Sequence, residues 1–471
     1  MSHPAALPDL PAPPAPRPRR PLLPVFVAAL SSLCAQLPPP PLPPPGFESR
    51  PPLAASDYEQ KTEGGYFTGL PLVNYDSNTG VGFGARGYYY YDGARSDPLF
   101  AYTPYLYRLF LQAFFTSGGM QYHWLDIDAR SIGGTPYLFR GQFMFERNID
   151  QHYFGIGSRT REPLSVSGSA QRYRHFDDYQ AELDRIDEQG QTRSRYDTYR
   201  FLRPMALLSL ERPLWGGRLR PLLGAGISYN QIDDYSGERV SIAGGERRAV
   251  MGVSRLKEDC DAGVIEGCQG GWNNFLRLGL SFDTRDYEPD PNQGVFIDAA
   301  LDVGTAVLGS EYDWVRVMLT PRAYVSPFPQ LADLVLAARG TLQVQSRRTP
   351  FFAMNLIPFT EEPRPGLGGL RTLRGYKQDR FVGPVMTLVN AELRWTFLRF
   401  DAGSQNFGLI AVPFLDLGSV YDRPSQLSLA GWKRDQGLAL RASWNLATLL
   451  VVEYAVSEED SGFYVNFNHI F

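Results

Sequence analysis

Residues 274–285 read Asn274-Phe-Leu-Arg-Leu-Gly-Leu-Ser-Phe-Asp-Thr-Arg285, and apolar side chains alternate with other kinds along the stretch. In an extended strand, alternate residues point to opposite faces. One face of this stretch is therefore apolar, whereas the other carries charged and hydroxyl groups. The pattern predicts a strand that lies between an apolar and a wet environment. The apolar residues are Leu276, Leu278, Leu280 and Phe282, and the polar ones are Arg277, Ser281, Asp283 and Arg285.

Sixteen runs with this alternation follow one another between residues 65 and 471. Most are about 10–16 residues long, roughly twice an average soluble strand and close to a tilted strand that crosses a bilayer. An even number of antiparallel strands closes a barrel with both chain ends on one side. We therefore expect an all-β fold, a transmembrane antiparallel β-barrel of about 16 strands. The runs lie near 66–75, 80–91, 100–115, 120–130, 137–148, 197–212, 217–232, 271–285, 294–304, 311–326, 332–346, 385–400, 406–420, 435–446, 448–456 and 462–471.

The connections between these runs differ in length according to their parity. With a periplasmic start, the odd-to-even connections face outside, and three of them are long: 149–196, 233–270 and 347–384. The opposite set is mostly short, as in Trp215-Gly-Gly217. Long external loops and short periplasmic turns are typical of outer-membrane barrels. In the charged segment 172–195 we expect a solvated loop with a short helix near residues 177–188, and receptor binding is the alternative.

The composition excludes other classes of protein. The formal net charge is −4, from 46 Lys and Arg against 50 Asp and Glu, which is not the balance of a nucleic-acid binder. No uninterrupted apolar stretch reaches the roughly 18–20 residues of a membrane-spanning helix. Histidines are few and scattered, so we expect no metal, no other cofactor and no enzymatic activity.

The N-terminal 52 residues have a composition of their own, with 18 of the 38 prolines. Arg17, Arg19 and Arg20 precede an apolar run at 25–35, which is the order of a secretory signal peptide. We expect a signal peptide at 1–35, a Pro-rich spacer at 36–60 and the barrel at 61–471. A lipoprotein acylated at Cys34 is the alternative.

Two further features fit an exported barrel. Phe463, Phe467 and Phe471 share one face of the last run, and such an ending resembles the signal that barrels present to the cell's own barrel-insertion machinery. Cys260 and Cys268 lie eight residues apart in an external loop, where an oxidising compartment favours a disulfide.

Three motifs occur in order near the C-terminus. The sixth external loop contains Gly366-Leu-Gly-Gly-Leu-Arg-Thr-Leu-Arg-Gly-Tyr376 and then Asp379-Arg-Phe-Val-Gly383. The next strand carries Asn390-Ala-Glu-Leu-Arg394, and the one after it Phe414-Leu-Asp-Leu-Gly-Ser-Val-Tyr421. These motifs resemble those of the bacterial surface antigen family, which includes the outer-membrane assembly factors BamA and TamA and the two-partner secretion transporters. The resemblance is good over 271–471 and weak before that.

The resemblance implies a specific site. In that family the sixth loop folds into the lumen, and its Arg-Gly-Tyr/Phe tip packs against acids on strands twelve and thirteen. The tip corresponds here to Arg374, Gly375 and Tyr376. The wall partners are Glu392, Asp416 and Gly418, and strand parity independently places both acids on the lumen face. The alternative is that Arg374 is a solvated loop arginine. Asp283, Arg285, Asp286 and Gly294 resemble the family's mid-barrel turn, although a generic turn fits them equally.

The resemblance also implies a function, assistance in inserting or translocating proteins or lipids through a seam between the first and last strands. The family's POTRA domains do not fit in the residues before the first strand, so we expect a branch consisting of the barrel alone. A passive, porin-like channel or a structural surface protein is the alternative. Expected partners are outer-membrane lipids including lipopolysaccharide, the insertion machinery, an unknown periplasmic partner and no nucleic acid, and the expected location is the bacterial outer membrane.

Overall fold

The computed structural model describes residues 53, 58, 61–76, 79–241, 246–286, 291–328, 333–358, 363–402, 405–444 and 448–467. All of them belong to the second of two compact units, Pro41–Phe471. The signal peptide predicted at 1–35, Cys34, nearly all of the spacer predicted at 36–60, and Phe471 lie outside the described residues.

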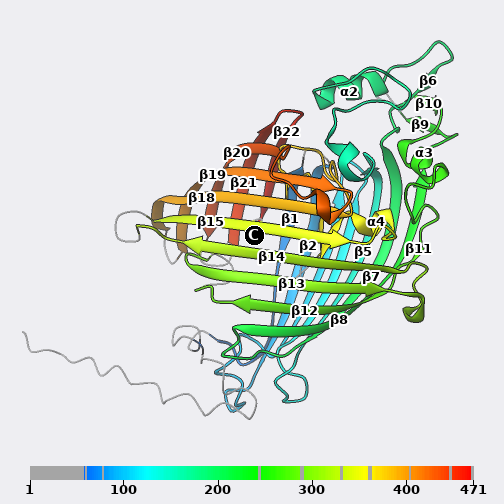
Figure 1. The fold of residues 1–471 in the computed structure, drawn as a ribbon. Helices are drawn as coiled ribbons and strands as arrows, with labels where there is room; N and C mark the ends of the chain where they lie inside the picture. Colours follow the sequence, from blue (N-terminus) through cyan, green and yellow to red (C-terminus); the bar gives the residue numbers. More distant parts are fainter. Residues whose placement is uncertain are drawn as a thin grey trace, which may run out of the picture. The chain divides into compact units, whose positions relative to one another are not determined.

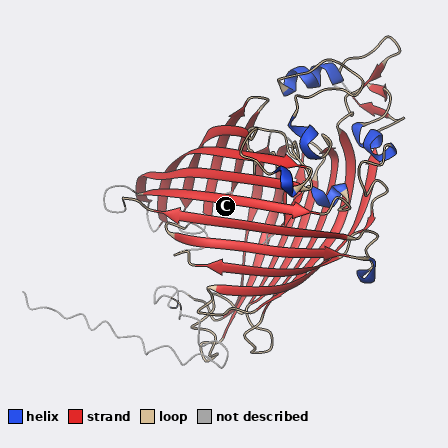
Figure 2. Ribbon diagram, in the orientation of Figure 1, coloured by secondary structure: helices blue, strands red, loops and turns tan. Residues whose placement is uncertain are grey.

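Sixteen long strands of the described chain form a closed antiparallel barrel, as predicted (Figures 1 and 2). Each pairs with the next along the chain, and β1 pairs with β22 to close the circle. A two-residue strand, β11 (Gly271–Trp272), precedes β12 and pairs with β8. The sixteen are β1 (Gly64–Asp76), β2 (Gly80–Gly93), β3 (Tyr107–Thr116), β4 (Gln121–Ala129), β5 (Leu138–His152), β7 (Thr198–Glu211), β8 (Leu219–Asp234), β12 (Phe275–Asp283), β13 (Gly294–Gly304), β14 (Trp314–Val325), β15 (Leu334–Gln345), β18 (Val385–Ala402), β19 (Gln405–Tyr421), β20 (Lys433–Trp444), β21 (Thr448–Ser457) and β22 (Ser461–Phe467).

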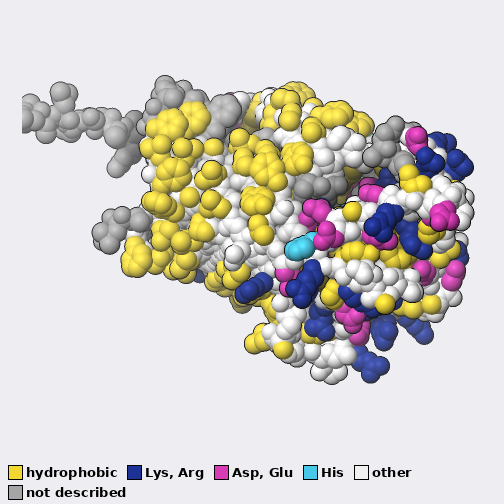
Figure 3. Space-filling model, turned by 90° about the horizontal axis from the view of Figure 1, so that it is seen from above, with side chains coloured by type: hydrophobic (Ala, Val, Ile, Leu, Met, Phe, Trp, Pro, Cys, Tyr) yellow, Lys and Arg dark blue, Asp and Glu magenta, His cyan; other side chains and the backbone are white. Residues whose placement is uncertain are grey.

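The two faces of the barrel wall differ as the alternation requires. Along β12, Leu276, Leu278 and Leu280 are exposed on the outside, the surface that lipid would cover. On the inside, Asp302 of β13 bonds both Arg277 and Arg316, and all three side chains are buried. Figure 3 shows apolar side chains over the barrel wall, while charged side chains gather at the end that carries the long loops.

The short helices and strands labelled in Figure 1 lie at the end of the barrel with the long loops. The connection between β5 and β7 includes helix α2 (Phe176–Leu183), which matches the predicted short helix but ends earlier. No helix in the described ranges is both long enough and apolar enough to cross a membrane. The other short elements are the 3₁₀ turns η1 (Gly157–Arg161), η2 (Ala306–Leu308) and η3 (Pro424–Gln426), strands β6 (Gln191–Thr192), β9 (Arg239–Ser241) and β10 (Arg247–Val250), helices α3 (Arg255–Asp261) and α4 (Phe351–Met354), and strands β16 (Leu356–Pro358) and β17 (Pro363–Pro365).

The three long connections pack against one another through a shared apolar cluster. Tyr153 comes from the first, Leu256 and Ile265 from the second, and Phe351 and Phe352 from the third. Cys260 and Cys268 pack against this cluster and form a disulfide, with their Cα atoms 5.8 Å apart. Asp259 joins two loops, because it accepts hydrogen bonds from Tyr153 and Arg159. The loops therefore form one connected cap.

The start of β3 differs most from its predicted boundary. The alternation suggested a strand from residue 100, but β3 begins at Tyr107, and the preceding residues form a buried turn. Lys61 explains the difference, because its Nζ donates to the carbonyls of Phe100 and Thr103 at 2.8 Å each and lies 4.1 Å from the Phe100 ring centroid. This β2–β3 connection is also longer than the short turns predicted at this end of the barrel.

Candidate functional site

The sixth loop, residues 347–384, turns back against the barrel wall. It contains α4 and the β16–β17 hairpin, and its tip is buried. Its apolar side chains form a cluster with the inner faces of β13, β14, β18 and β19. This apolar packing is one set of contacts that holds the loop against the wall. The cluster consists of Ala300, Met318, Ile357, Leu367, Leu373, Tyr376, Phe381, Met386, Leu388 and Val420.

Arg374 lies at the centre of the tip and is fully buried. Its guanidinium donates to both oxygens of Asp416, from Nε at 2.8 Å and from Nη2 at 2.9 Å. Nη1 donates to Glu392 at 3.1 Å and to Glu453 at 2.6 Å. The planar fork of arginine is suited to holding several carboxylates in this way. One loop side chain thus bonds β18, β19 and β21.

Further buried arginines join the carboxylates around Arg374. Glu392 also accepts from Arg394 at 2.9 Å and from Arg441 at 2.7 and 3.0 Å. Three arginines therefore share the three acids Glu392, Asp416 and Glu453, and every member has a buried side chain. A buried charge is tolerated only when it is paired and hydrogen-bonded in this manner.

The two residues after Arg374 fit tightly against the wall. A Cβ on Gly375 would lie 2.7 Å from Cβ of Asp435, 2.9 Å from the Ser457 nitrogen and 3.0 Å from the Val456 carbonyl carbon. Only glycine allows this approach to β20 and β21. Tyr376 is buried, its ring lies edge-on to Phe381 at 5.0 Å, and its hydroxyl donates to the Arg434 carbonyl at 3.2 Å.

A second group of ion pairs holds the part of the loop that follows the tip. Arg380 donates to both oxygens of Glu459, at 2.6 and 2.9 Å, and to the carbonyls of Thr160 and Glu162. Lys377 pairs with Asp460 at 3.1 Å. The sixth loop therefore also contacts the β21–β22 connection and the first long loop.

Asp379 follows in the same segment and has an unusual environment. Its carboxylate is buried and accepts hydrogen bonds from Gln151 of β5, from Asn355 and from the backbone N–H of Gly366. Burial raises its pKa to about 7, although the hydrogen bonds from Asn355 and Gly366 oppose the shift. The pKa is also raised by nearby Glu146 and lowered by Arg203. Asp379 therefore changes charge near neutral pH.

The remaining predicted residues lie apart from the tip, except Gly418. That residue is beneath the loop, where a Cβ would sit 3.2 Å from Leu373. Asp283 accepts from Arg285 within the β12–β13 turn, and Asp286 accepts backbone N–H groups across it. Gly294 closes this turn with φ of +108°, which favours glycine. Phe463 is exposed on β22, Phe467 lies in the same strand, and Phe471 is outside the described residues.

Several residues of the site were missed by the sequence argument. Glu453 and Arg441 complete the network. Asn390, which stands in the motif quoted for β18, joins Asp416 to the carbonyl of Thr372. Tyr464 of β22 donates to the Arg374 carbonyl at 2.9 Å. The available signal was a lone charge on the lumen face of an otherwise apolar strand, as for Glu453 in Leu449-Leu-Val-Val-Glu-Tyr-Ala455.

The barrel closes at a seam between β1 and β22. Among the described residues, β1 and β22 pair only through Tyr75 with Val465 and Asp76 with Tyr464. The β1–β2 pairing, by contrast, runs along the whole of β1, from Gly64 to Asp76. The rings of Tyr75 and Phe463 lie 5.8 Å apart outside the seam.

A comparison with protein families decides the classification. Residues 139–471 match the Omp85 superfamily domain. The chain belongs to the Omp85 superfamily. Residues 46–106, which include β1 and β2, match a domain of unknown function, DUF5982. The family resemblance predicted from the motifs is thus confirmed, and no curated protein sequence matches the chain.

Solved structures of Omp85-type barrels resemble this one at low sequence identity. BamA from Haemophilus ducreyi lacking POTRA domains 1–3 matches with a TM-score of 0.50 and 13% identity, over 86% of this chain and 70% of that one. CdiB from Escherichia coli matches with a TM-score of 0.48 and 11% identity, over 85% of this chain and 62% of CdiB. A bacterial polysaccharide outer membrane secretin matches with a TM-score of 0.36 and 8% identity, over 86% of this chain and 97% of the secretin. The chain thus spans less than two thirds of CdiB, and at these identities the likeness to BamA shows the fold alone.

Membership in the superfamily establishes the general role. Omp85 proteins are barrels of the bacterial outer membrane that serve insertion or translocation, and this chain is one of them. The superfamily is one of assembly and transport proteins rather than of enzymes.

Proposed function

We propose that this Omp85 barrel assists the insertion or transport of proteins or lipids by opening between β1 and β22. The observation that carries the proposal is the limited pairing between the described residues of β1 and β22. Two described residue pairs join β1 to β22, whereas β22 is joined to β21 from Leu450–Phe467 to Val456–Ser461. Because each ladder pair adds hydrogen bonds and side-chain contact, the described part of the seam is held by fewer of these interactions than the described part of the β21–β22 joint.

In this proposal the sixth loop serves as the anchor of the C-terminal half of the barrel. Arg374 bonds side chains of β18, β19 and β21, and its carbonyl accepts from Tyr464 of β22. Movement at the seam therefore carries β22 together with the strands that hold the loop. An open seam presents the unpaired edges of β1 and β22, to which an incoming strand could add.

The other assignments complete the proposal. The chain is exported by a signal peptide at 1–35, carries a Pro-rich spacer at 36–60 and begins its barrel at 61. Phe463, Phe467 and Phe471 form the signal that the cell's barrel-insertion machinery reads. Outer-membrane lipids, including lipopolysaccharide, surround the apolar wall, a periplasmic partner delivers the cargo, and the protein acts without catalysis.

A disulfide lock tests the seam. Tyr75→Cys with Val465→Cys places two cysteines on directly paired residues across it. Val73→Cys with Phe83→Cys is the matched control, because these residues pair within the β1–β2 hairpin and are also exposed on the outer face. Each variant replaces the wild-type chain in cells, and outer-membrane protein and lipid profiles are compared with and without a reductant.

We expect the seam lock to reproduce the profile of cells that lack the protein and the reductant to restore the normal one, while the control remains normal throughout. A locked seam that supports the same profile as the control lock contradicts the proposal.

A passive channel is the competing function. Two cavities inside the barrel, of about 430 and 280 Å³, share Met120, Tyr122 and Arg371 in their linings. In planar bilayers, a steadily open and ion-selective pore together with an unchanged envelope would favour that function. Brief, irregular openings are expected if the sixth loop fills the lumen.

A further inference from the structure

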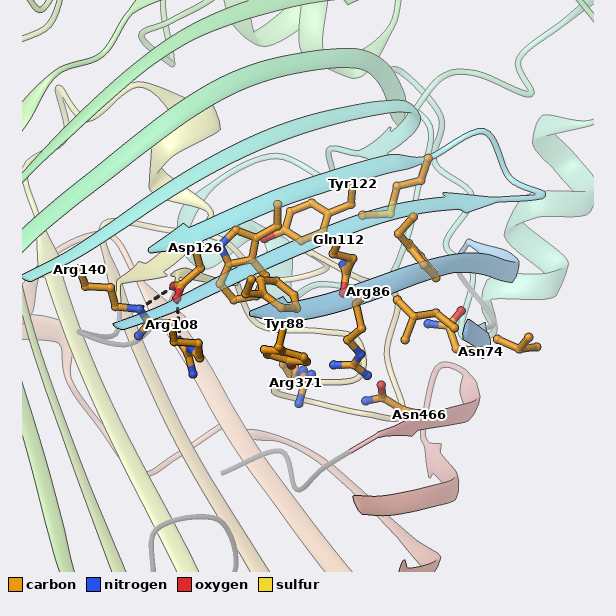
Figure 4. A pocket seen from close by; sticks show the side chains of 16 residues that line it. Asn74, Arg86, Tyr88, Arg108, Gln112, Tyr122, Asp126, Arg140, Arg371 and Asn466 are labelled. Carbon is orange, nitrogen blue, oxygen red and sulfur yellow. Dashed lines mark hydrogen bonds and ion pairs between the residues drawn. The ribbon is translucent and has the colours of Figure 1, made fainter. Parts of the chain in front are cut away.

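A cavity of about 430 Å³ lies on the inner face of the first strands (Figure 4). Its lining comes from β1–β5, from Arg371 of the sixth loop and from Asn466 of β22. Small-molecule sites commonly have volumes of about 300–1,000 Å³. The cavity is separate from the Arg374 network, whose members do not line it.

The lining of the cavity contains more basic than acidic side chains. Arg86, Arg108, Arg140 and Arg371 line it, while Asp126 is the acid in the lining. Asp126 bonds both Arg108 and Arg140, at 2.7 Å each, so one carboxylate is shared between two guanidinium groups (Figure 4). The lining thus carries an excess of positive charge, in a lumen where water screens it less than at the surface.

Hydrogen-bond donors are also in excess. Trp124 lines the cavity, and its Nε1–H is buried without an acceptor, as is Nε of Arg108. The indole N–H and the guanidinium group can donate hydrogen bonds but cannot accept them. A buried donor without an acceptor costs free energy, which a ligand rich in acceptor oxygens removes.

Aromatic rings supply the rest of the wall. Tyr88 and Phe110 lie 4.8 Å apart, and Phe110 meets Trp124 edge-on at 5.1 Å. Rings beside arginines suit a ligand that combines an anionic group with a sugar or other carbon body. Asn74 of β1 and Asn466 of β22 border the cavity from the two sides of the seam. A headgroup in the cavity could therefore remain attached to lipid chains outside the wall.

From these observations we propose that the cavity binds a phosphorylated sugar headgroup, with Arg86, Arg108, Arg140 and Arg371 around the phosphate and the rings of Tyr88, Phe110 and Trp124 against the sugar. The headgroup could be lipid-borne or free. A free headgroup can bind without opening of the seam, so failure of this site and failure of the proposed function are distinguishable.

Calorimetric titration of the purified full chain in detergent tests the site. The probes are glucosamine 6-phosphate against glucosamine, and diphosphorylated against monophosphorylated lipid A. Arg86→Gln and Arg371→Gln each remove one lining charge, and Arg86→Lys keeps the charge without the fork. Arg220→Gln is the control, because Arg220 is a half-buried arginine of β8 that does not line the cavity.

We expect each phosphate added to a probe to strengthen binding, Arg86→Gln and Arg371→Gln to weaken it at least tenfold, and Arg86→Lys to restore part of it. Binding of both phosphorylated classes identifies a headgroup site open to either source, and binding of lipid A alone identifies a lipid-borne ligand. The absence of binding, equal binding of glucosamine, or the same loss in Arg220→Gln overturns the proposal. Retained heat-modifiable migration on gels shows for each variant that the barrel has folded.

Discussion

The guanidinium of Arg374 and the carboxylate of Asp416 meet side by side, with Nε 2.8 Å from one oxygen and Nη2 2.9 Å from the other. Both side chains are fully buried, and 42 residues separate them along the chain. This pair joins the tip of the sixth loop to β19, and the guanidinium carbon lies 3.3 Å from the ring centroid of Phe414 in the same strand. The relationship determines where the loop can lie inside the barrel.

Replacing Arg374 with alanine removes the cation that three carboxylates share. We expect the free energy of unfolding to fall by about 3–5 kcal/mol, because the remaining buried carboxylates are left without their shared cation. A nitroxide at Leu370, which lines a lumen cavity, should become more mobile, and the heat-modifiable band should convert at lower temperature. Arg185→Ala is the control, since its side chain is 76% exposed. An immobile label and an unchanged conversion temperature would show that Arg374 is not the anchor.

Gly375→Ala should move the tip away from the wall without removing any charge. The new Cβ would meet Asp435, Ser457 and Val456 at 3.0 Å or less, and two of these contacts are with backbone atoms that cannot rotate aside. We expect partial loss of function and greater protease sensitivity between residues 366 and 383. Gly340→Ala is the matched control, because its Cβ would lie 3.6 Å from Pro321, an ordinary contact. Equal behaviour of the two variants would contradict the close fit.

The docking of the sixth loop should depend on pH through Asp379. Its pKa is raised by burial to about 7 from an ordinary value of 3.8, so the folded loop favours the protonated acid. The resulting stabilisation is complete below about pH 4 and is lost as the pH rises towards 7. The difference of about three pKa units between the docked and undocked loop corresponds to at most about 4 kcal/mol in the free energy of docking.

The test compares the mobility of the Leu370 label between pH 5 and 8. The label should become more mobile with rising pH in the wild-type loop and should be insensitive to pH in Asp379→Asn. Asparagine also tolerates the positive φ of 57° at this position. Mobility that rises equally in both proteins would assign the effect to another group.

Removing the disulfide should loosen the cap and leave the barrel intact. Cys260 and Cys268 close a loop of few residues, so the bond limits the freedom of a short segment. In the Cys260→Ser, Cys268→Ser variant we expect faster proteolysis between residues 255 and 270 at unchanged barrel conversion temperature. A large fall in that temperature would mean that the cap contributes to the stability of the barrel.

The strands could be predicted from the sequence because membrane and lumen impose opposite demands on alternate residues. The apolar side of β12 and the acids of β18 and β19 follow from parity alone. The start of β3 did not follow, because Lys61 and Phe100 meet only in three dimensions and replace ladder pairing by a buried turn. The β16–β17 hairpin lies within a segment where no alternation indicated strands.

The site could be predicted only in part. Arg374, Glu392 and Asp416 stand in motifs, whereas Glu453 and Arg441 are single charges in apolar strands with no motif around them. Their role depends on how β20 and β21 are placed around the loop, which neighbouring residues in the sequence do not reveal. The cavity beside β1–β5 was missed for the same reason, since its four arginines come from four separate segments.

The most direct test of the central claim is depletion of the protein followed by quantitative comparison of outer-membrane proteins and lipids. If the chain is an assembly or transport barrel, a defined set of proteins or lipids should fall in the outer membrane and accumulate in the periplasm or inner membrane. Wild-type chain should restore the profile, and Arg374→Ala should restore it only in part. Unchanged protein and lipid profiles after depletion, with an open ion-conducting pore formed by the purified chain, would contradict the account.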